Sequence, residues 1–298
     1  MQQRQYAGVA MAIMKERLGR LVWPTIIASA VLIILQIASV IGVLTGAIPL
    51  WLGFIGALIA IHASFTIIHE ASHKALSGGK KGFGWIDTIA GYIHALMLTY
   101  DFPTFKYLHL RHHQFTNDPT ADPDYWLQRY PMPLVVILSL AVPLHYLKLY
   151  IECARKGLLT RRDQLFTGMR IVFQAGLIIA LLIIAPWETF FLWVLPSALA
   201  SSMISLSHGM LHMPEVTEDR KKTVRMIVGD GFWEWIICPF FWLNNHHYLH
   251  HEFPRASCLS HPKMYKATRE QLAAEGVEVI TIGKPLLSKP PAKPGSAA

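Results

Sequence analysis

Charged residues and cysteines are scarce in this chain, and each scarcity excludes a class of protein. Only 15% of its 298 residues are charged, against about 25% in ordinary soluble domains. Hydrophobic residues make up 53% of the chain, and the mean hydropathy is +0.35. This composition argues against an ordinary soluble enzyme and against a disordered chain. The three cysteines (Cys153, Cys238 and Cys258) form no CxxC pair, so neither a zinc ribbon, an iron–sulfur site nor a disulfide framework is predicted.

Lysine and arginine are absent from two long segments, residues 21–73 and 171–219, which hold the longest apolar runs. The 27 basic residues therefore lie before, between and after these segments, and so does the net charge of +8. This distribution is typical of a multi-pass membrane protein whose basic loops face the cytosol. We accordingly expect both termini and the polar loops on the cytosolic side. No recognition motif accompanies the basic residues, so we expect no nucleic-acid partner.

Each segment without basic residues predicts a helical hairpin. Residues 22–44, at about 1.5 Å per residue, exceed the hydrocarbon thickness of about 30 Å, and the chain returns after an uncharged turn. The first hairpin is expected over residues 22–68 and the second over 171–207, with its turn at Pro186, Trp187 and Glu188. The first apolar stretch is too long for a signal-peptide core and lacks an evident cleavage site, so we expect it to be retained.

A third apolar stretch, residues 131–150, is interrupted by Pro133, Pro143 and His145 and has basic residues on both flanks. The positive-inside rule places both flanks on one side of the membrane, so we interpret the stretch as interfacial or re-entrant. Residues 83–98 and 232–243 are shorter and are also predicted to be interfacial.

The sequence therefore predicts an all-α integral membrane protein with four transmembrane helices in two hairpins, interfacial helices and a cytosolic cap. We expect one domain over residues 1–275, in which residues 69–170 and 208–275 form the cap. The Pro- and Lys-rich residues 276–298 are expected to form a flexible tail.

Fifteen histidines are many for a chain of this length, and most stand in four clusters. The clusters are HEASH from His69, HLRHH from His109, HGMLH from His208 and HHYLHH from His246. Residues at i, i+3 and i+4 share one helix face, so HxxxH points two imidazoles the same way and HxxHH points three. Each cluster falls on the predicted cytosolic side, where all four can converge. Eight or nine ligands are too many for one ion and suit two.

The spacing selects a set of candidate ligands for a cap that carries two metal ions. In the last cluster HxxHH selects His247 over His246, and in the third cluster we favour His212 over His208. The predicted ligands are His69, His73, His109, His112, His113, His212, His247, His250 and His251. Residues expected to orient them or to serve as alternative ligands are His208, His246, Asn244, Asn245, Glu70, Asp118, Asp122, Asp124 and Glu252. Two octahedral ions with open positions for dioxygen favour iron.

Four histidines stand apart from the clusters. For His94, His145 and His261 we expect ordinary hydrogen-bonded polar residues. His62 lies seven residues before His69, two helical turns deeper on the same face. An ionisable group inside a membrane span is a functional candidate, so we expect His62 to line a substrate channel.

The sequences HEASH, HLRHH followed by TNDPTADPDYW, and HHYLHHEFP resemble the histidine boxes of the membrane fatty-acid desaturase superfamily. This superfamily also includes alkane hydroxylases, acyl-lipid hydroxylases and carotenoid hydroxylases or ketolases, and the resemblance covers residues 61–254. It implies a four-span fold, two non-haem iron ions and the use of dioxygen to attack an unactivated C–H bond. It also implies ligand roles for the histidines of the three main boxes. His212 stands where relatives often have an extra ligand, and His208 where several have asparagine.

The resemblance leads us to expect desaturation or hydroxylation of a membrane-soluble substrate, with a fatty acyl chain as the first choice. A carotenoid (β-carotene) ring hydroxylase or ketolase and an alkane hydroxylase are the alternatives. No HPGG-type cytochrome b5 segment occurs in the sequence, so we expect a separate donor, a ferredoxin, rubredoxin or cytochrome b5-like protein, with its reductase. A different class, the histidine-rich metal transporter, requires histidines across the membrane depth, whereas only His62 lies within a predicted span.

Overall fold

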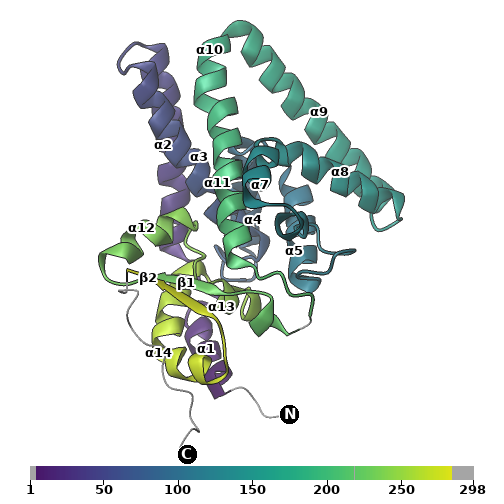
Figure 1. Cartoon of the computed structure of the whole chain (residues 1–298). Coiled ribbons are helices and arrows are strands. Elements are labelled where there is room, and N and C mark those ends of the chain that lie inside the picture. Colours follow the sequence, from purple (N-terminus) through teal and green to yellow (C-terminus); the bar gives the residue numbers. More distant parts are fainter. Residues whose placement is uncertain (1–4, 218, 284–298) are drawn as a thin grey trace, which may run out of the picture.

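The computed structural model describes residues 5–217 and 219–283, which form an almost entirely helical protein. Within them, five helical segments are long and apolar enough to cross a membrane. These are Trp23–Leu44 (α2), Leu50–Ser72 (α3), Met132–Arg155 (α7 to α8), Arg161–Ile184 (α9) and Pro186–Leu211 (α10 to α11). Figure 1 shows α2, α3, α9 and α11 extending toward one end, while α1, α13 and α14 gather at the other, which we call the histidine end. The predicted all-α class of membrane protein is confirmed.

The first hairpin consists of α2 and α3, and its two helices pack closely. Pro24 lies in the first turn of α2, where its missing N–H removes no helical hydrogen bond. A Cβ atom on Gly53 of α3 would lie 2.4 Å from Val43 Cγ2, so glycine permits this approach. α3 continues to Ser72, beyond the expected end at residue 68, and thereby carries His69 to the histidine end.

The second hairpin begins earlier than residue 171, because α9 starts at Arg161 after the capping residue Thr160. Arg170 is accommodated in this helix by an ion pair in which its Nε lies 2.5 Å from Asp101 Oδ1. The turn is short, since the chain bends at Ala185 and becomes helical again at once. The returning helix comprises α10 (Pro186–Thr189), the π-helical turn η2 (Phe190–Val194) and α11 (Leu195–Leu211).

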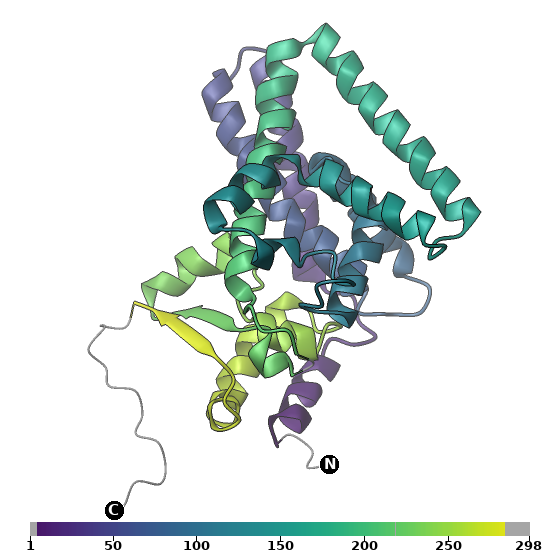
Figure 2. The same ribbon diagram turned by 45° about the vertical axis from the view of Figure 1, so that its right-hand side comes forward.

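The segment between the hairpins differs from the others because it is broken. The 3-10 helix η1 (Ser139–Ala141) separates α7 (Met132–Leu138) from α8 (Val142–Arg155). α7 packs against α11 and α8 against α5, and Figure 2 shows α8 running across the direction of α11. Length and composition alone admit this segment as a fifth span. The expected total of four spans, with this stretch at the interface, stays a prediction.

The histidine end is built from short helices and one small sheet. Strand β1 pairs in parallel with β2, with Met226 opposite Val279. β2 lies within the first part of the expected flexible tail, residues 276–298, so strand pairing fixes that part of the tail. Residues 284–298 lie outside the described part. The remaining elements are α1 (Gln5–Lys15), α4 (Gly84–Met97), α5 (Phe102–Gln114), α6 (Trp126–Arg129), η3 (Arg220–Lys222), β1 (Met226–Gly229), α12 (Phe232–Phe240), α13 (His247–Glu252), η4 (Cys258–Ser260), α14 (His261–Ala274) and β2 (Val279–Ile282).

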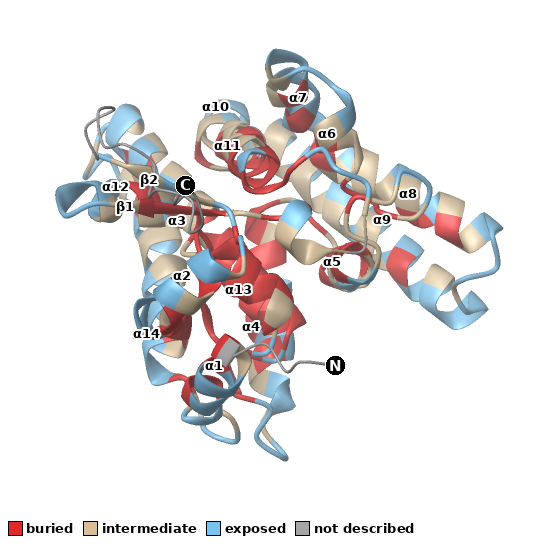
Figure 3. Cartoon of the chain, turned by 60° about the horizontal axis from the view of Figure 1, so that its bottom comes forward, coloured by how far each residue is buried: buried red, intermediate tan, exposed pale blue. Residues whose placement is uncertain are grey.

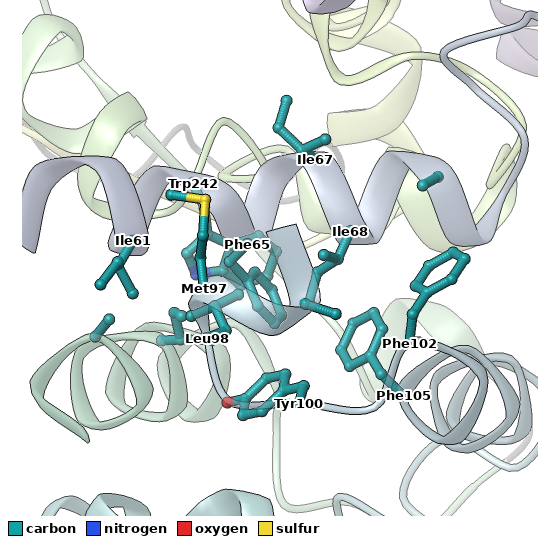
Figure 4. Close-up of a cluster of buried hydrophobic side chains, with 14 of the residues drawn as sticks. Ile61, Phe65, Ile67, Ile68, Met97, Leu98, Tyr100, Phe102, Phe105 and Trp242 are labelled. Atoms are coloured by element: carbon teal, nitrogen blue, oxygen red, sulfur yellow. The ribbon is translucent and has the colours of Figure 1, made fainter. Parts of the chain in front are cut away.

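Buried side chains hold the histidine-bearing helices against one another. Figure 3 shows α13 and its neighbours as mostly buried, whereas α12 and much of α9 are exposed. In the larger hydrophobic cluster, Phe65 of α3 lies between Trp242 and Phe105 (Figure 4). The centroid of its ring is 4.7 Å from that of Trp242 and 5.6 Å from that of Phe105. His94 of α4 joins this packing as expected of a structural histidine, because its two ring nitrogens lie 2.8 Å from the hydroxyls of Ser29 and Ser64. α2, α3 and α4 are thereby fixed together.

Candidate metal centre

Four elements converge to form one histidine cluster. His69 lies in the last turn of α3, whose C-cap is His73, and His212 is the C-cap of α11. α5 and α13 each present HxxHH on a buried face. All nine predicted ligands lie in two adjacent buried groups, within each of which the donor atoms are within 4.8 Å of one another. The five-histidine group is His69, His73, His109, His113 and His250, and the four-histidine group is His112, His212, His247 and His251.

The spacing of the ring nitrogens fits coordination of a metal ion. In the five-histidine group, His109 Nε2 lies 2.8 Å from His73 Nε2 and 3.2 Å from His113 Nε2. In the four-histidine group, His247 Nε2 lies 2.9 Å from His212 Nε2 and 3.1 Å from the corresponding atom of His251. Two imidazoles bound at about 2.1 Å and at right angles place their nitrogens about 3.0 Å apart. The observed distances match this right-angled arrangement.

The protonation states also suit a metal. Burial, and then the neighbouring imidazoles, lower the pKa values of His109, His113, His247, His250 and His251 well below the usual value. These rings are therefore neutral, which is the form that donates a lone pair to a metal. Buried groups without hydrogen-bond partners are rare, yet the buried Nε2 of His112 has none among the described residues. A metal ion would provide its partner.

Each candidate ligand of the four-histidine group has a polar side chain at one ring nitrogen. His112 Nδ1 lies 2.9 Å from Asp122 Oδ1, and His247 Nδ1 lies 3.1 Å from Asn244 Nδ2. The other two contacts are His212 Nδ1 with Asn117 Oδ1 at 3.4 Å and His251 Nδ1 with Thr116 Oγ1 at 3.3 Å. Burial works to lower the pKa of His112, but Asp122 reverses the effect and the pKa is raised. These partners orient the rings, as is usual around metal ligands.

Asn117 is a functional residue that the sequence reasoning missed. Its backbone has φ +64°, and its amide N donates to Asp122 Oδ2 at 2.7 Å. Its side chain also donates to the carbonyl of Met213, next to His212. Asparagine tolerates this left-handed conformation better than most residues. The signal was present in the sequence as an Asn four residues after the HLRHH cluster.

A third group consists of His112, Asp124 and His208. His208 Nε2 lies 3.7 Å from Asp124 Oδ2, and Tyr146 donates its hydroxyl to Asp124 Oδ1 at 3.0 Å. Burial raises the pKa of Asp124 to about 6. His208 and Asp124 therefore lie beside the four-histidine group and border the cavity described below.

The other candidates for orienting residues lie away from the ligand atoms. Glu70 points to η4, where its Oε1 accepts the amide of Cys258 at 3.1 Å. Asn245 donates to Glu234 Oε1 at 3.1 Å. The ring of His246 packs against Tyr265 at a centroid distance of 5.3 Å.

Two further carboxylates, Asp118 and Glu252, interact with residues outside the histidine cluster. Asp118 accepts from the backbone and hydroxyl of Thr120, each at 2.7 Å, and so shapes the loop after α5. Glu252 accepts from Tyr6 at 3.4 Å and faces Arg220. Asp118 thus stabilises a loop rather than a ring of the cluster.

His261 does not match the expectation of a hydrogen-bonded polar residue. It is fully buried, and neither ring nitrogen has a hydrogen-bond partner among the described residues. Burial lowers its pKa to about 3, and its ring centroid is 5.8 Å from that of His250. It therefore acts as a neutral packing group behind the five-histidine group. His145 is similar in part, since its Nε2 has no hydrogen-bond partner in the described part of the chain and its ring packs on Trp126.

Cavities lead toward this centre from the apolar helices. A small cavity of about 20 Å³, which we call the inner cavity, is lined by His109 of one group and by Asp124 and His208 beside the other. His62 lines a separate chamber of about 680 Å³ between α2, α3, α11 and α12. Its expected role in a substrate channel stays a prediction. No ligand histidine lines that chamber, and Trp242 at its wall is 5.6 Å from the ring centroid of His69.

Apolar helices long enough to cross a membrane, together with two buried imidazole groups, define a membrane protein whose histidine cluster suits metal binding. The family model of the fatty acid desaturases matches residues 45–283, a range that contains both groups. The chain therefore belongs to the fatty acid desaturase family, and this membership implies an oxidoreductase. No curated protein matches the sequence.

Proposed function

We propose that this protein is a dioxygen-dependent oxidoreductase that holds two non-haem iron ions and desaturates or hydroxylates a lipophilic substrate. A fatty acyl chain is the first substrate that we propose, in keeping with the family. The observation that carries the proposal is the pair of adjacent histidine groups with five and four donors. Imidazole suits several transition metals, but two right-angled groups with remaining open positions favour octahedral iron over tetrahedral zinc.

Iron in these groups would supply the activation of dioxygen and the oxidation of a C–H bond. The chain itself supplies the holding, orienting and shielding of the reacting groups. Asp122 accepts the Nδ1 proton of His112, which leaves Nε2 as the donor toward a metal. Phe105 and Tyr100 line the inner cavity with aromatic rings. The substrate carbon would lie in this cavity, beside His109 and between the two groups.

We place the histidine end on the cytosolic side of the membrane. The connection at residues 45–49, and the bend at Ala185 with the α10 helix that follows it, contain no lysine or arginine, whereas basic residues flank the spans at the histidine end. This asymmetry follows the positive-inside rule. A separate electron donor, a ferredoxin, rubredoxin or cytochrome b5-like protein, would then dock on the same side with its reductase. The basic loops there favour an acidic partner.

The decisive experiment measures metal and reactivity together. We expect purified protein to contain close to two iron ions per chain and to consume dioxygen when reductant and substrate are present. His113→Ala should lower both quantities, whereas the control His145→Ala, on α8 outside both groups, should change neither. Wild-type protein with well under two iron ions, or activity that survives His113→Ala, would overturn the proposal.

Product analysis then assigns the substrate. The gene is expressed in a host with and without a carotenoid pathway, and both acyl chains and pigments are profiled. A new double bond or hydroxyl on an acyl chain supports the first choice. An oxidised carotenoid ring, or an oxidised alkane where one is supplied, would replace the acyl chain as substrate.

A further inference from the structure

The two large chambers of the membrane-spanning part differ in their connection to the metal centre. The His62 chamber ends at Trp242 and has no ligand histidine in its wall. The other chamber, about 350 Å³ in volume, lies between α8, α9 and α11 and above the start of α5. We call it the lateral chamber. Its position raises the question of which chamber the substrate uses.

Three aromatic residues belong both to the lateral chamber and to the inner cavity. Tyr100, Phe105 and Tyr146 line each of them. Phe105 also stacks on the ligand His109, with ring centroids 5.4 Å apart and planes 6° from parallel. The lateral chamber is therefore separated from a ligand histidine by this one aromatic layer.

Tyr100 and Tyr146 are held in place at this layer. The hydroxyl of Tyr100 lies 3.1 Å from Ser201 Oγ on α11, and the hydroxyl of Tyr146 donates to Asp124. The two rings have centroids 5.8 Å apart. The pair thus forms a constriction whose position is fixed by α11 and by the loop that carries Asp124.

The outer wall of the lateral chamber is apolar and faces the bilayer. It includes Ile171, Ala175 and Ile178 of α9 and Val194 and Ala198 near α11. Figure 2 shows α9 diverging from α11 toward the histidine end. Most side chains of α9 are exposed although the helix is apolar, as expected of a helix surrounded by lipid. A molecule dissolved in the bilayer can thus reach the chamber without entering water.

One polar atom interrupts this apolar wall. The side-chain nitrogen Nε2 of Gln174 on α9 is buried and has no hydrogen-bond partner among the described residues. Gln174 lies one helical turn beyond Arg170, whose charge is already neutralised by Asp101. An unpaired buried donor inside an apolar chamber is complementary to a ligand that is mostly hydrocarbon but carries an acceptor oxygen.

We propose that the substrate is a bilayer-dissolved lipid that enters the lateral chamber between α9 and α11. Gln174 binds an oxygen of this lipid, and Tyr100 and Tyr146 control its access to the metals. This inference deepens the proposed function and rests on it. A substrate delivered from the bilayer needs no water-soluble carrier. The His62 chamber is, on this view, outside the substrate route.

Photolabelling in proteoliposomes tests the route without requiring turnover. The probe is a long-chain fatty acid methyl ester with a diazirine near its methyl end, and labelled residues are located by mass spectrometry of peptides. We expect labels on the peptides that contain Tyr100 or Phe105, which line the lateral chamber and are buried from the bilayer. Ala198→Trp should abolish this labelling, whereas Ala63→Trp, which fills the His62 chamber, should leave it unchanged. Ile178→Trp on the exposed helix α9 serves if Ala198→Trp does not fold.

The role of Gln174 is tested with a second probe, an alkane of the same length that carries the same diazirine. Gln174→Leu should weaken labelling by the ester about fivefold, the contribution of one hydrogen bond, and leave labelling by the alkane unchanged. Labels confined to the His62 chamber, or labelling that persists in both lateral-chamber tryptophan variants, would overturn the route. Equal effects of Gln174→Leu on both probes would overturn the polar contact.

Metal content separates a failure of the route from a failure of the proposed function. Protein that holds two iron ions and turns over substrate but shows no lateral label refutes only the route. Protein that is labelled as expected but holds well under two iron ions refutes the oxidoreductase proposal.

Discussion

The two histidine groups differ in how their imidazole rings are held in place. In the four-histidine group, every candidate ligand ring has a polar partner at one nitrogen: Asp122, Asn117, Asn244 or Thr116. In the five-histidine group, the Nδ1 atoms of His113 and His250 have no hydrogen-bond partner among the described residues. The smaller group thus relies on individually oriented ligands, whereas the larger group relies on an additional donor and on packing. The comparison predicts that the two groups respond differently to mutation.

The largest effect is expected in the four-histidine group. His251→Ala leaves three imidazoles there, whereas loss of one histidine from the other group leaves four. We expect the metal content to fall from two ions to about one per chain, with loss of activity. Metal analysis after dialysis measures this change. Retention of both ions would show that the two groups do not differ as we infer.

A smaller effect is expected from the equivalent change in the five-histidine group. His73→Ala leaves four imidazoles, as His113→Ala does. One ion should therefore bind more weakly and be partly lost on purification, but both ions should bind at saturating metal. Titration with a chelator, compared with His251→Ala under the same conditions, measures the difference. Complete loss of one ion from His73→Ala alone would reverse the order of the two groups.

The next effect concerns orientation rather than coordination. Asp122→Asn keeps the shape of the side chain but removes the charge that faces His112 Nδ1 at 2.9 Å. Loss of such a partner typically weakens metal affinity by about 10- to 100-fold. We expect a change within this range for one ion only. Asp118→Asn is the matched control, because Asp118 only shapes the loop after α5 and should leave the affinity unchanged.

Helical spacing explains why so much of the centre was visible in the sequence. HxxxH and HxxHH place their rings on one helix face whatever surrounds the helix, so the clusters of candidate ligands follow from the spacing. The choice of His212 over His208 does not, because HxxxH contains both. The hairpins follow similarly from apolar length and the absence of basic residues. The start of α9 was misplaced because the Arg170–Asp101 ion pair, a contact distant in sequence, lets a charged turn extend an apolar helix.

Residues outside the helical repeats were harder to find, because loops place them. Asn117 reaches His212 only through a left-handed turn, and Asp118, its neighbour, points away from the cluster. The parallel pairing of β1 with β2 depends on the long crossover through α12, α13 and α14, which no local pattern in Val279–Ile282 reveals. The division of nine histidines into groups of five and four is likewise a tertiary property, since each group draws on several helices.

The smallest effect is expected from His246, which marks the edge of the four-histidine group. It precedes His247 in the chain, but its ring faces Tyr265 on α14 at a centroid distance of 5.3 Å. Burial lowers its pKa to about 4, so it is a neutral packing residue. His246→Gln should therefore leave two ions bound, with affinities within about twofold of the wild type, a difference of less than 0.5 kcal/mol. The neighbouring His247→Gln removes a ligand whose Nε2 is 2.9 Å from that of His212 and should release one ion. Chelator titration of the two variants side by side tests whether the group ends between residues 246 and 247, and equal metal loss from both would place His246 among the ligands.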